Sequence, residues 1–202
     1  MRDLIEKYAW ADEDDDLVLT LGVFPRGSIA RATRIYGADD GEVDIMTHYD
    51  AWVPQEDFGS YFRVQIAEAL NAAYGAVVAI EPNGWTGAVP EIARRASEGG
   101  RFFSVNWSMS GTRRIVEAVS GKVTAFFNPF LIGEPGGMGD VVPDWVEDVV
   151  FDIDQPNASS FAAVELRTGV QVEQAWFTEP LPTYRIPDPD VLLAGVEGAR
   201  VP

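Results

Sequence analysis

Nineteen glycines and thirteen prolines are spread along the whole chain, and this frequent interruption most limits what it can fold into. Both residues break regular backbone hydrogen bonding, so they predict many short helices and strands joined by turns. A helical bundle or coiled coil needs long uninterrupted helices and is therefore disfavoured. With 202 residues, 47% of them apolar, the chain can bury a core, and we expect a single α+β domain over residues 1–202.

Three strands are expected close together in the middle of the chain. Each has apolar or alternating character, and the two-residue turn Ser120-Gly121 suits a hairpin between the last two. The sequence therefore predicts an antiparallel sheet, with a meander within residues 101–128, on which several short helices pack. The expected strands are Phe102 to Trp107, Arg113 to Val119 and Lys122 to Phe127.

Prolines near helix starts and glycines after helix ends mark the other elements. Two apolar runs, 17–24 and 76–80, are expected to be strands. The expected helices are 25–37, ended by Gly37, 90–96, ended by Gly99 and Gly100, a short helix after Pro143, and 158–168, with Asn157 as its N-cap and Gly169 at its end.

Residues 61–74 fit two structures. Phe62 to Ile66 alternates as in a strand, but apolar residues up to Ala73 also recur at helical spacing. The break at Tyr74-Gly75, followed by an apolar run, favours a hairpin, so we predict a strand. We expect the Asp- and Gly-rich stretch 38–60 to be an insertion of low order, and the proline-rich tail, residues 179–202, to wrap the surface without forming an element.

The chain is strongly acidic, with 32 Asp and Glu against 15 Lys and Arg and a formal charge of −17. A negative surface repels a phosphate backbone, so direct nucleic-acid binding is disfavoured. It would steer a basic protein partner, as in immunity or decoy proteins, although acidic side chains also serve solubility alone. The run Asp12 to Asp16 repels itself and is expected to be a solvated loop.

Few residues suit catalysis or metal binding. There is no cysteine, and the single histidine, His48, lies in the stretch of low order and is expected to be a solvated loop residue. Asp12, Asp14 and Asp16 have the spacing of the first ligands in a calcium loop but lack its later ligands. The glycine-rich loop 133–139 has neither a dinucleotide nor a Walker pattern and is expected to be flexible. We expect no metal, no cofactor and no catalytic residue.

The N-terminus is charged, and no apolar run approaches the roughly 18 residues that a membrane span needs. A signal peptide would need an apolar run at this end of the chain, where Arg2, Asp3, Glu6 and Lys7 stand. We therefore expect no membrane association and a cytoplasmic protein.

The string Glu81-Pro82-Asn83-Gly84-Trp85 follows the predicted strand 76–80 and is the least generic part of the chain. Pro82 fixes φ and Asn-Gly tolerates positive φ, so the string predicts a tight turn with positive φ at Gly84. Tryptophan is usually a core residue, but Trp85 and Trp107 would be able to frame a surface cleft, with polar contacts from Glu81 and Asn83. These four residues are the candidate binding residues.

The same string carries a resemblance to a known family. Over about residues 8–190 the chain resembles domain-of-unknown-function family 6461, seen mostly in actinobacteria, in which the Glu-Pro-Asn-Gly-Trp string is the hallmark. That family has no assigned catalytic residue, so the resemblance implies an intact domain and no mechanism, and the segment Asp39 to Tyr74 is longer than the family pattern. The other matching features are Tyr8-Ala9-Trp10 with the acidic loop, the helix ended by Gly37, the strand through Trp107 and Thr168-Gly169-Val170.

These observations favour a protein-interaction module of immunity, decoy or regulatory type, without catalytic activity, that meets a basic protein. One alternative is a carboxylate-dependent hydrolase, because glycoside hydrolysis needs only two carboxylates at the correct separation. Another is a small-ligand sensor with an aromatic pocket near Trp85. Two partly buried carboxylates facing each other in a cleft would favour the hydrolase.

Overall fold

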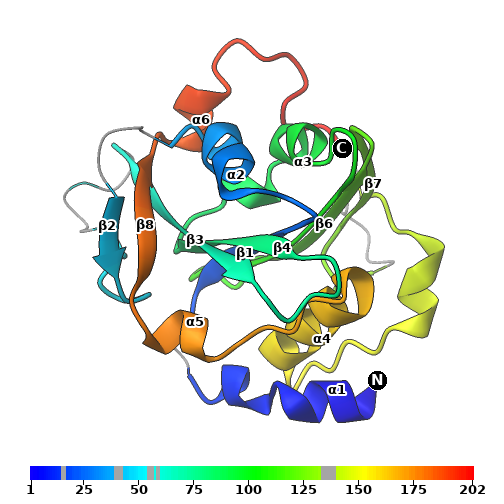
Figure 1. The fold of residues 1–202 in the computed structure, drawn as a ribbon. Helices are drawn as coiled ribbons and strands as arrows, with labels where there is room; N and C mark the ends of the chain where they lie inside the picture. Colours follow the sequence, from blue (N-terminus) through cyan, green and yellow to red (C-terminus); the bar gives the residue numbers. More distant parts are fainter. Residues whose placement is uncertain (15–16, 39–42, 54–56, 58–59, 133–139) are drawn as a thin grey trace.

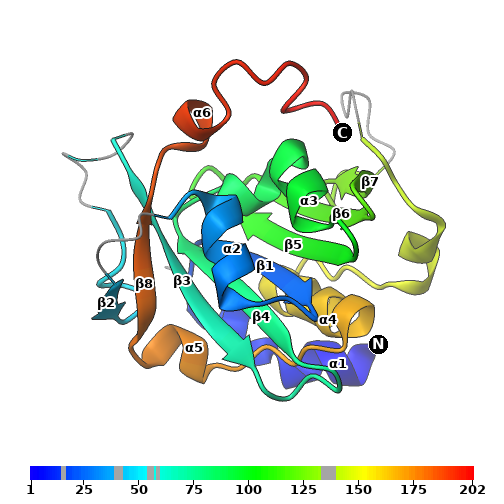
Figure 2. The same cartoon turned by 45° about the horizontal axis from the view of Figure 1, so that its top comes forward.

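The protein folds into a sheet with helices on both faces (Figures 1 and 2). The structure, a computed structural model, describes residues 1–14, 17–38, 43–53, 57, 60–132 and 140–202. The α+β class with an antiparallel sheet is confirmed. The glycine-rich segment 133–139 and residues 15–16 of the acidic run lie outside the described residues. None of the helices among the described residues is long and apolar enough to cross a membrane.

Eight strands form the sheet in the order β2-β8-β3-β4-β1-β5-β6-β7, and every neighbouring pair is antiparallel. The predicted meander is present as β5, β6 and β7, and the ambiguous segment 61–74 contains a strand, β3, as predicted. The strands are β1 (Leu19–Pro25), β2 (Val43–Met46), β3 (Phe62–Ala69), β4 (Ala76–Pro82), β5 (Arg101–Trp107), β6 (Arg113–Val119), β7 (Lys122–Phe127) and β8 (Leu181–Ile186).

The helices divide between the two faces of the sheet. In Figure 1, α2 and α3 lie above the sheet, and α1, α4 and α5 lie below it. The helices and 3-10 helices are α1 (Arg2–Lys7), η1 (Ala9–Asp12), α2 (Ile29–Tyr36), η3 (Thr86–Ala88), α3 (Pro90–Ala96), η4 (Asp144–Asp148), α4 (Pro156–Thr168), α5 (Ala175–Thr178) and α6 (Pro189–Leu192).

Strand β1 lies at the centre of the sheet and has a hydrophobic core on each side of it. Leu21 and Val23 belong to the core with α4, whereas Phe24 belongs to the core with α2 and α3. Because both faces are covered, the strand reads as a nearly continuous apolar run in the sequence. Both ends of β1 are held by the strands and cores around them. One hollow of the surface lies beside each end.

The prediction that residues 179–202 form no element was wrong. Residues 181–186 form β8, which pairs with β3 on one side and β2 on the other. The chain then forms α6 and returns over α3, where Leu193 and Ala199 pack on Val89 and Ile92 (Figure 2). The tail is thus part of the sheet and of a small third core.

Within the stretch 38–60, the described residues include a strand and a buried histidine that were not predicted. Residues 43–46 form β2, which pairs with β8 along the edge of the sheet. His48 is fully buried, with its ring 5.6 Å from that of Phe177, so the prediction of a solvated loop histidine was wrong. Burial lowers the pKa of His48 to about 4, and the ring is neutral at physiological pH.

Helix α4 is capped by a residue from the other end of the chain. Asn157, predicted as the N-cap, lies inside the helix, and Gln155 occupies the N-cap position without a side-chain cap. The Asp12 carboxylate instead accepts hydrogen bonds from the backbone N–H groups of Asn157 and Ala158, at 2.8 and 2.9 Å. Asp12 is therefore a tertiary helix cap rather than part of a solvated loop, because the first N–H groups of a helix have no partner within it.

We expect Asp12→Ala to lower the free energy of unfolding by about 1–2 kcal/mol, because two backbone donors lose their acceptor. Urea denaturation measures the loss, and Glu13→Ala is the matched control, since Glu13 makes no side-chain hydrogen bond within the described part of the chain. Equal stability of the two variants would contradict the capping role of Asp12.

Candidate functional site

The turn after β4 has its positive φ one residue earlier than predicted. Asn83 has φ 53°, and Gly84 is outside the left-handed region. A glycine is nevertheless needed at position 84, because a Cβ there would lie 2.8 Å from Glu81 Oε2. The prediction of positive φ at Gly84 was therefore wrong: close approach to Glu81 excludes a side chain, and asparagine tolerates the left-handed conformation next to it.

Glu81 lies at the end of β4 and is completely buried. Its two carboxylate oxygens accept hydrogen bonds from the backbone N–H groups of Thr86 and Gly87, both at 2.7 Å. Burial raises the pKa of Glu81 to about 7, and the hydrogen bonds from Thr86 and Gly87 lower it in part. Tyr36 of α2 faces the same carboxylate, and burial together with the Glu81 charge raises its pKa well above the usual range.

Three buried polar side chains of the neighbouring strands hold the turn in place. Thr20 of β1 donates a hydrogen bond to the Gly84 carbonyl oxygen at 2.6 Å and accepts one from Asn106 of β5 at 2.8 Å. Ser104 of β5 donates to the Gly87 carbonyl oxygen at 2.7 Å. The turn is therefore fixed to the sheet at several points, and its geometry is set before any ligand arrives.

A cleft of about 390 Å³ opens beside this turn, at the end of the sheet where β1 begins and β4 and β5 end. Val18 and Gly84 form part of its wall, and the loop after β5 forms another part. Asn83, Trp85 and Trp107, three of the four candidate binding residues, all line it. The other lining residues are Asn106, Ser108, Met109, Ser110 and Thr112.

The two tryptophans approach the cleft from opposite faces of the sheet. Trp85 packs edge-on against Phe62, with ring centroids 4.6 Å apart, in the core under α2 and α3. Trp107 belongs to the core under α4 and donates its indole N–H to the Leu17 carbonyl oxygen. Both rings are held by these contacts, so they offer rigid walls. Glu81, the fourth candidate, does not line the cleft and lies behind Gly84.

The described lining of the cleft carries hydroxyl groups but no acidic or basic side chain. Its hydroxyl groups belong to Ser108, Ser110 and Thr112, which contact one another at 2.8 and 3.3 Å. A hydroxyl nucleophile needs a general base, and no His, Asp, Glu or Lys is among the described residues that line the cleft. The described residues contain no group of three or more potential metal ligands. What the cleft offers is apolar and hydrogen-bonding contact.

Sequence reasoning missed the residues that support the turn. Thr20, Tyr36 and Ser104 are far from the string in sequence. Thr20 and Ser104 reach it because β1 pairs with both β4 and β5, and Tyr36 reaches it because α2 packs on this face of the sheet. Met109, on the rim of the cleft and 72% exposed, was also missed. The available signal for it was an apolar side chain between two serines in a hairpin loop, since hairpin loops normally carry polar residues.

The chain matches no known family model, no curated protein and no solved structure. The resemblance to family 6461 through the string Glu81 to Trp85 therefore stays a prediction.

Proposed function

We propose that the protein is a non-catalytic interaction module that binds a segment of a basic protein in the cleft between Trp85 and Trp107. The observation that carries this proposal is the composition of the cleft: two rigid tryptophans, an exposed methionine and several neutral hydrogen-bonding groups. Aromatic residues and methionine are typical of the centre of a protein interface, where they provide most of the contact energy.

The charge of the chain supports a basic partner. A formal charge of −17 attracts a positively charged protein from a distance, whereas the neutral cleft supplies short-range contacts. The hydrolase alternative finds less support, because its two carboxylates would have to face each other in a cleft, and the described lining of this one contains neither Asp nor Glu.

A capture experiment with matched variants tests the proposal. Met109→Lys places a charge on the rim of the cleft, and Leu70→Lys makes the same change at a side chain that is 85% exposed and does not line the cleft. Both sites are exposed, so both variants should fold. We expect immobilised wild-type protein and L70K to retain the same basic protein from host lysate in similar amounts. M109K should retain at least tenfold less of it than the wild type.

The purified partner then gives the decisive measurement. Its association rate should fall steeply between 50 and 300 mM salt, because opposite fields are screened beyond about 8 Å at physiological ionic strength. Equal retention by M109K and L70K would contradict the cleft as the binding site. A neutral or acidic partner, or association that is insensitive to salt, would contradict the role of the charge. A small molecule bound in the cleft would instead support the sensor alternative.

A further inference from the structure

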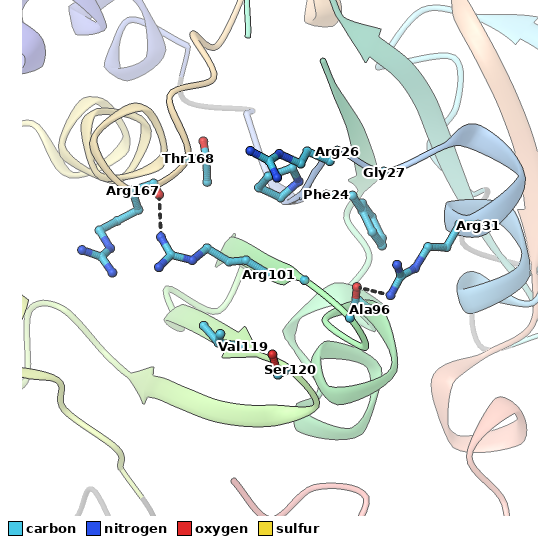
Figure 3. Close-up of a pocket in the computed structure, with 13 residues that line it drawn as sticks. Phe24, Arg26, Gly27, Arg31, Ala96, Arg101, Val119, Ser120, Arg167 and Thr168 are labelled. Atoms are coloured by element: carbon cyan, nitrogen blue, oxygen red, sulfur yellow. Dashed lines mark hydrogen bonds between the residues drawn. The ribbon is translucent and has the colours of Figure 1, made fainter. Parts of the chain in front are cut away.

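A second hollow lies at the opposite end of β1 from the turn cleft. Its volume is about 460 Å³, and Phe24 and Pro25 at the end of β1 form part of its wall. The C-terminal ends of α3 and α4 and the ends of β5 and β6 supply the rest (Figure 3). It shares no lining residue with the turn cleft. Its properties are therefore independent of the proposed function.

Four arginines line this hollow: Arg26, Arg31, Arg101 and Arg167. The described lining contains neither Asp nor Glu. The whole chain has 15 basic residues against 32 acidic ones, so four arginines around one hollow are a strong local excess of basic residues. The Arg167 side chain extends away from Arg26, and its guanidinium group lies over the Trp145 ring at 4.7 Å (Figure 3). We call these four residues and the space between them the arginine pocket.

Two of the arginines hold the walls of the arginine pocket. Nη2 of Arg31 donates to the Ala96 carbonyl oxygen at 3.1 Å, at the C-terminal end of α3, and also to the carbonyl oxygens of Arg95 and Glu98. Arg101 donates to the Arg167 carbonyl oxygen at 3.0 Å, at the C-terminal end of α4 (Figure 3). A guanidinium group has five N–H donors, so these bonds leave donors for a ligand.

The positive charge is only partly balanced. Glu117, which is outside the lining, contacts Arg167 at 3.0 Å and Arg101 at 3.6 Å. Arg26 and Arg31 make no ion pair within the described part of the chain. One carboxylate thus faces Arg101 and Arg167, and the charges of Arg26 and Arg31 are left without an ion pair among the described residues, so the arginine pocket keeps a net positive charge.

Arg26 has an unusual backbone for its residue type. Its φ is 60°, in the left-handed region, and its N–H donates to the Gly75 carbonyl oxygen at 3.0 Å. This conformation costs free energy in a residue with a side chain, and such residues concentrate at ligand sites. Figure 3 shows the side chains of Arg26 and Arg101 on two sides of the space beside Thr168.

We infer that the arginine pocket binds a phosphate dianion, either inorganic phosphate or the head group of a small phosphate monoester. Planar guanidinium groups bind phosphate oxygens in pairs, and the Ser120 hydroxyl, also in the lining, adds a neutral donor. The Thr168 hydroxyl donates to the Val164 carbonyl oxygen at 2.7 Å and is therefore not a donor to the ligand. The volume accommodates a small organic body, for which Phe24 and Val119 offer apolar contact. A nucleic acid is disfavoured, because it would meet the acidic remainder of the surface.

Calorimetric titration at low ionic strength tests this inference with inorganic phosphate, a sugar phosphate and the unphosphorylated sugar. We expect the two phosphates to bind and the sugar not to bind. Tighter binding of the sugar phosphate would assign the monoester as ligand, and equal or tighter binding of inorganic phosphate would assign the free ion. Binding should be several-fold tighter at pH 7.5 than at pH 5.5, because a phosphate monoester loses its second proton near pH 6, and inorganic phosphate loses its second proton about one pH unit higher.

Arg26→Gln removes one guanidinium group, which lies over the Tyr74 ring, 4.7 Å from its centroid. Arg185→Gln is the matched control, because Arg185 lies over the Tyr61 ring at 3.9 Å, outside the arginine pocket. We expect R26Q to weaken phosphate binding at least tenfold and R185Q less than twofold. No heat of binding at 10 mM phosphate, equal effects of the two variants, or equal binding of chloride at the same ionic strength would overturn the inference.

Discussion

Gly87→Ala should lower the free energy of unfolding by about 3 kcal/mol, because there is no room for a methyl group at this position. A Cβ at position 87 would lie 2.5 Å from the Tyr36 hydroxyl oxygen, 3.1 Å from Thr20 Cγ2 and 3.2 Å from Glu81 Oε1. The side chains of Thr20 and Glu81 are fixed by hydrogen bonds, so they are unable to move aside cheaply. Urea denaturation gives the loss directly.

Two further variants show whether the loss comes from this close approach. Gly100→Ala is the control, since a Cβ at Gly100 meets no atom within 4 Å and its φ is not positive, and it should change stability by less than about 0.5 kcal/mol. Tyr36→Phe removes the nearest oxygen, so in the G87A background it should recover part of the loss. A G87A variant as stable as G100A would contradict the packing described here.

Local patterns were enough to predict much of the sheet. The hairpin of β6 and β7 follows from Ser120-Gly121, where both residues have positive φ, at 51° and 78°. The helix end at Gly37 follows from its left-handed conformation, at φ 65°. In each case the signal lies within a few residues of the feature that it predicts, and tertiary contacts do not oppose it.

Features that depend on distant pairing were not predicted. The prolines of the tail indicate an irregular segment, yet β8 tolerates Pro182 because its pairing with β3 begins only at Thr183. His48 is buried against Phe177, which lies far from it in the sequence, so no local pattern around His48 predicts this contact. The same limit applies to the turn: its sequence indicated a tight bend, but the support of Glu81 comes from residues that only the folded sheet brings near.

The buried carboxylate of Glu81 should make stability depend on pH. Its pKa is about 7 in the folded protein and near 4.5 when the side chain is exposed to water. Between these values the folded state binds a proton that the unfolded state has released, so raising the pH favours unfolding. The contribution of Glu81 to the free energy of unfolding is therefore complete below pH 4.5 and is lost as the pH rises through 7. The total loss is on the order of 3 kcal/mol.

Other groups also titrate in this range, so the measurement compares wild-type protein with Glu81→Gln. Glutamine does not titrate, and its NH₂ group faces one of the N–H donors of Thr86 and Gly87, so E81Q should be less stable at every pH. The difference in free energy of unfolding between wild type and E81Q should be largest near pH 4.5 and shrink by about 3 kcal/mol by pH 8. The surface variant Glu98→Gln should show a constant difference from wild type over the same range.

The direction of this change separates two roles for the carboxylate. If Glu81 were held ionised by the two backbone N–H groups, its pKa would lie below the ordinary value, and the advantage over E81Q would grow as the pH rises from 3 to 5. If burial dominates, as the complete enclosure of the side chain indicates, the advantage shrinks between pH 4.5 and 7. If the stability difference between wild type and E81Q grows or stays constant between pH 4.5 and 7, the raised pKa of Glu81 is contradicted. The turn would then be held by an ionised carboxylate at neutral pH.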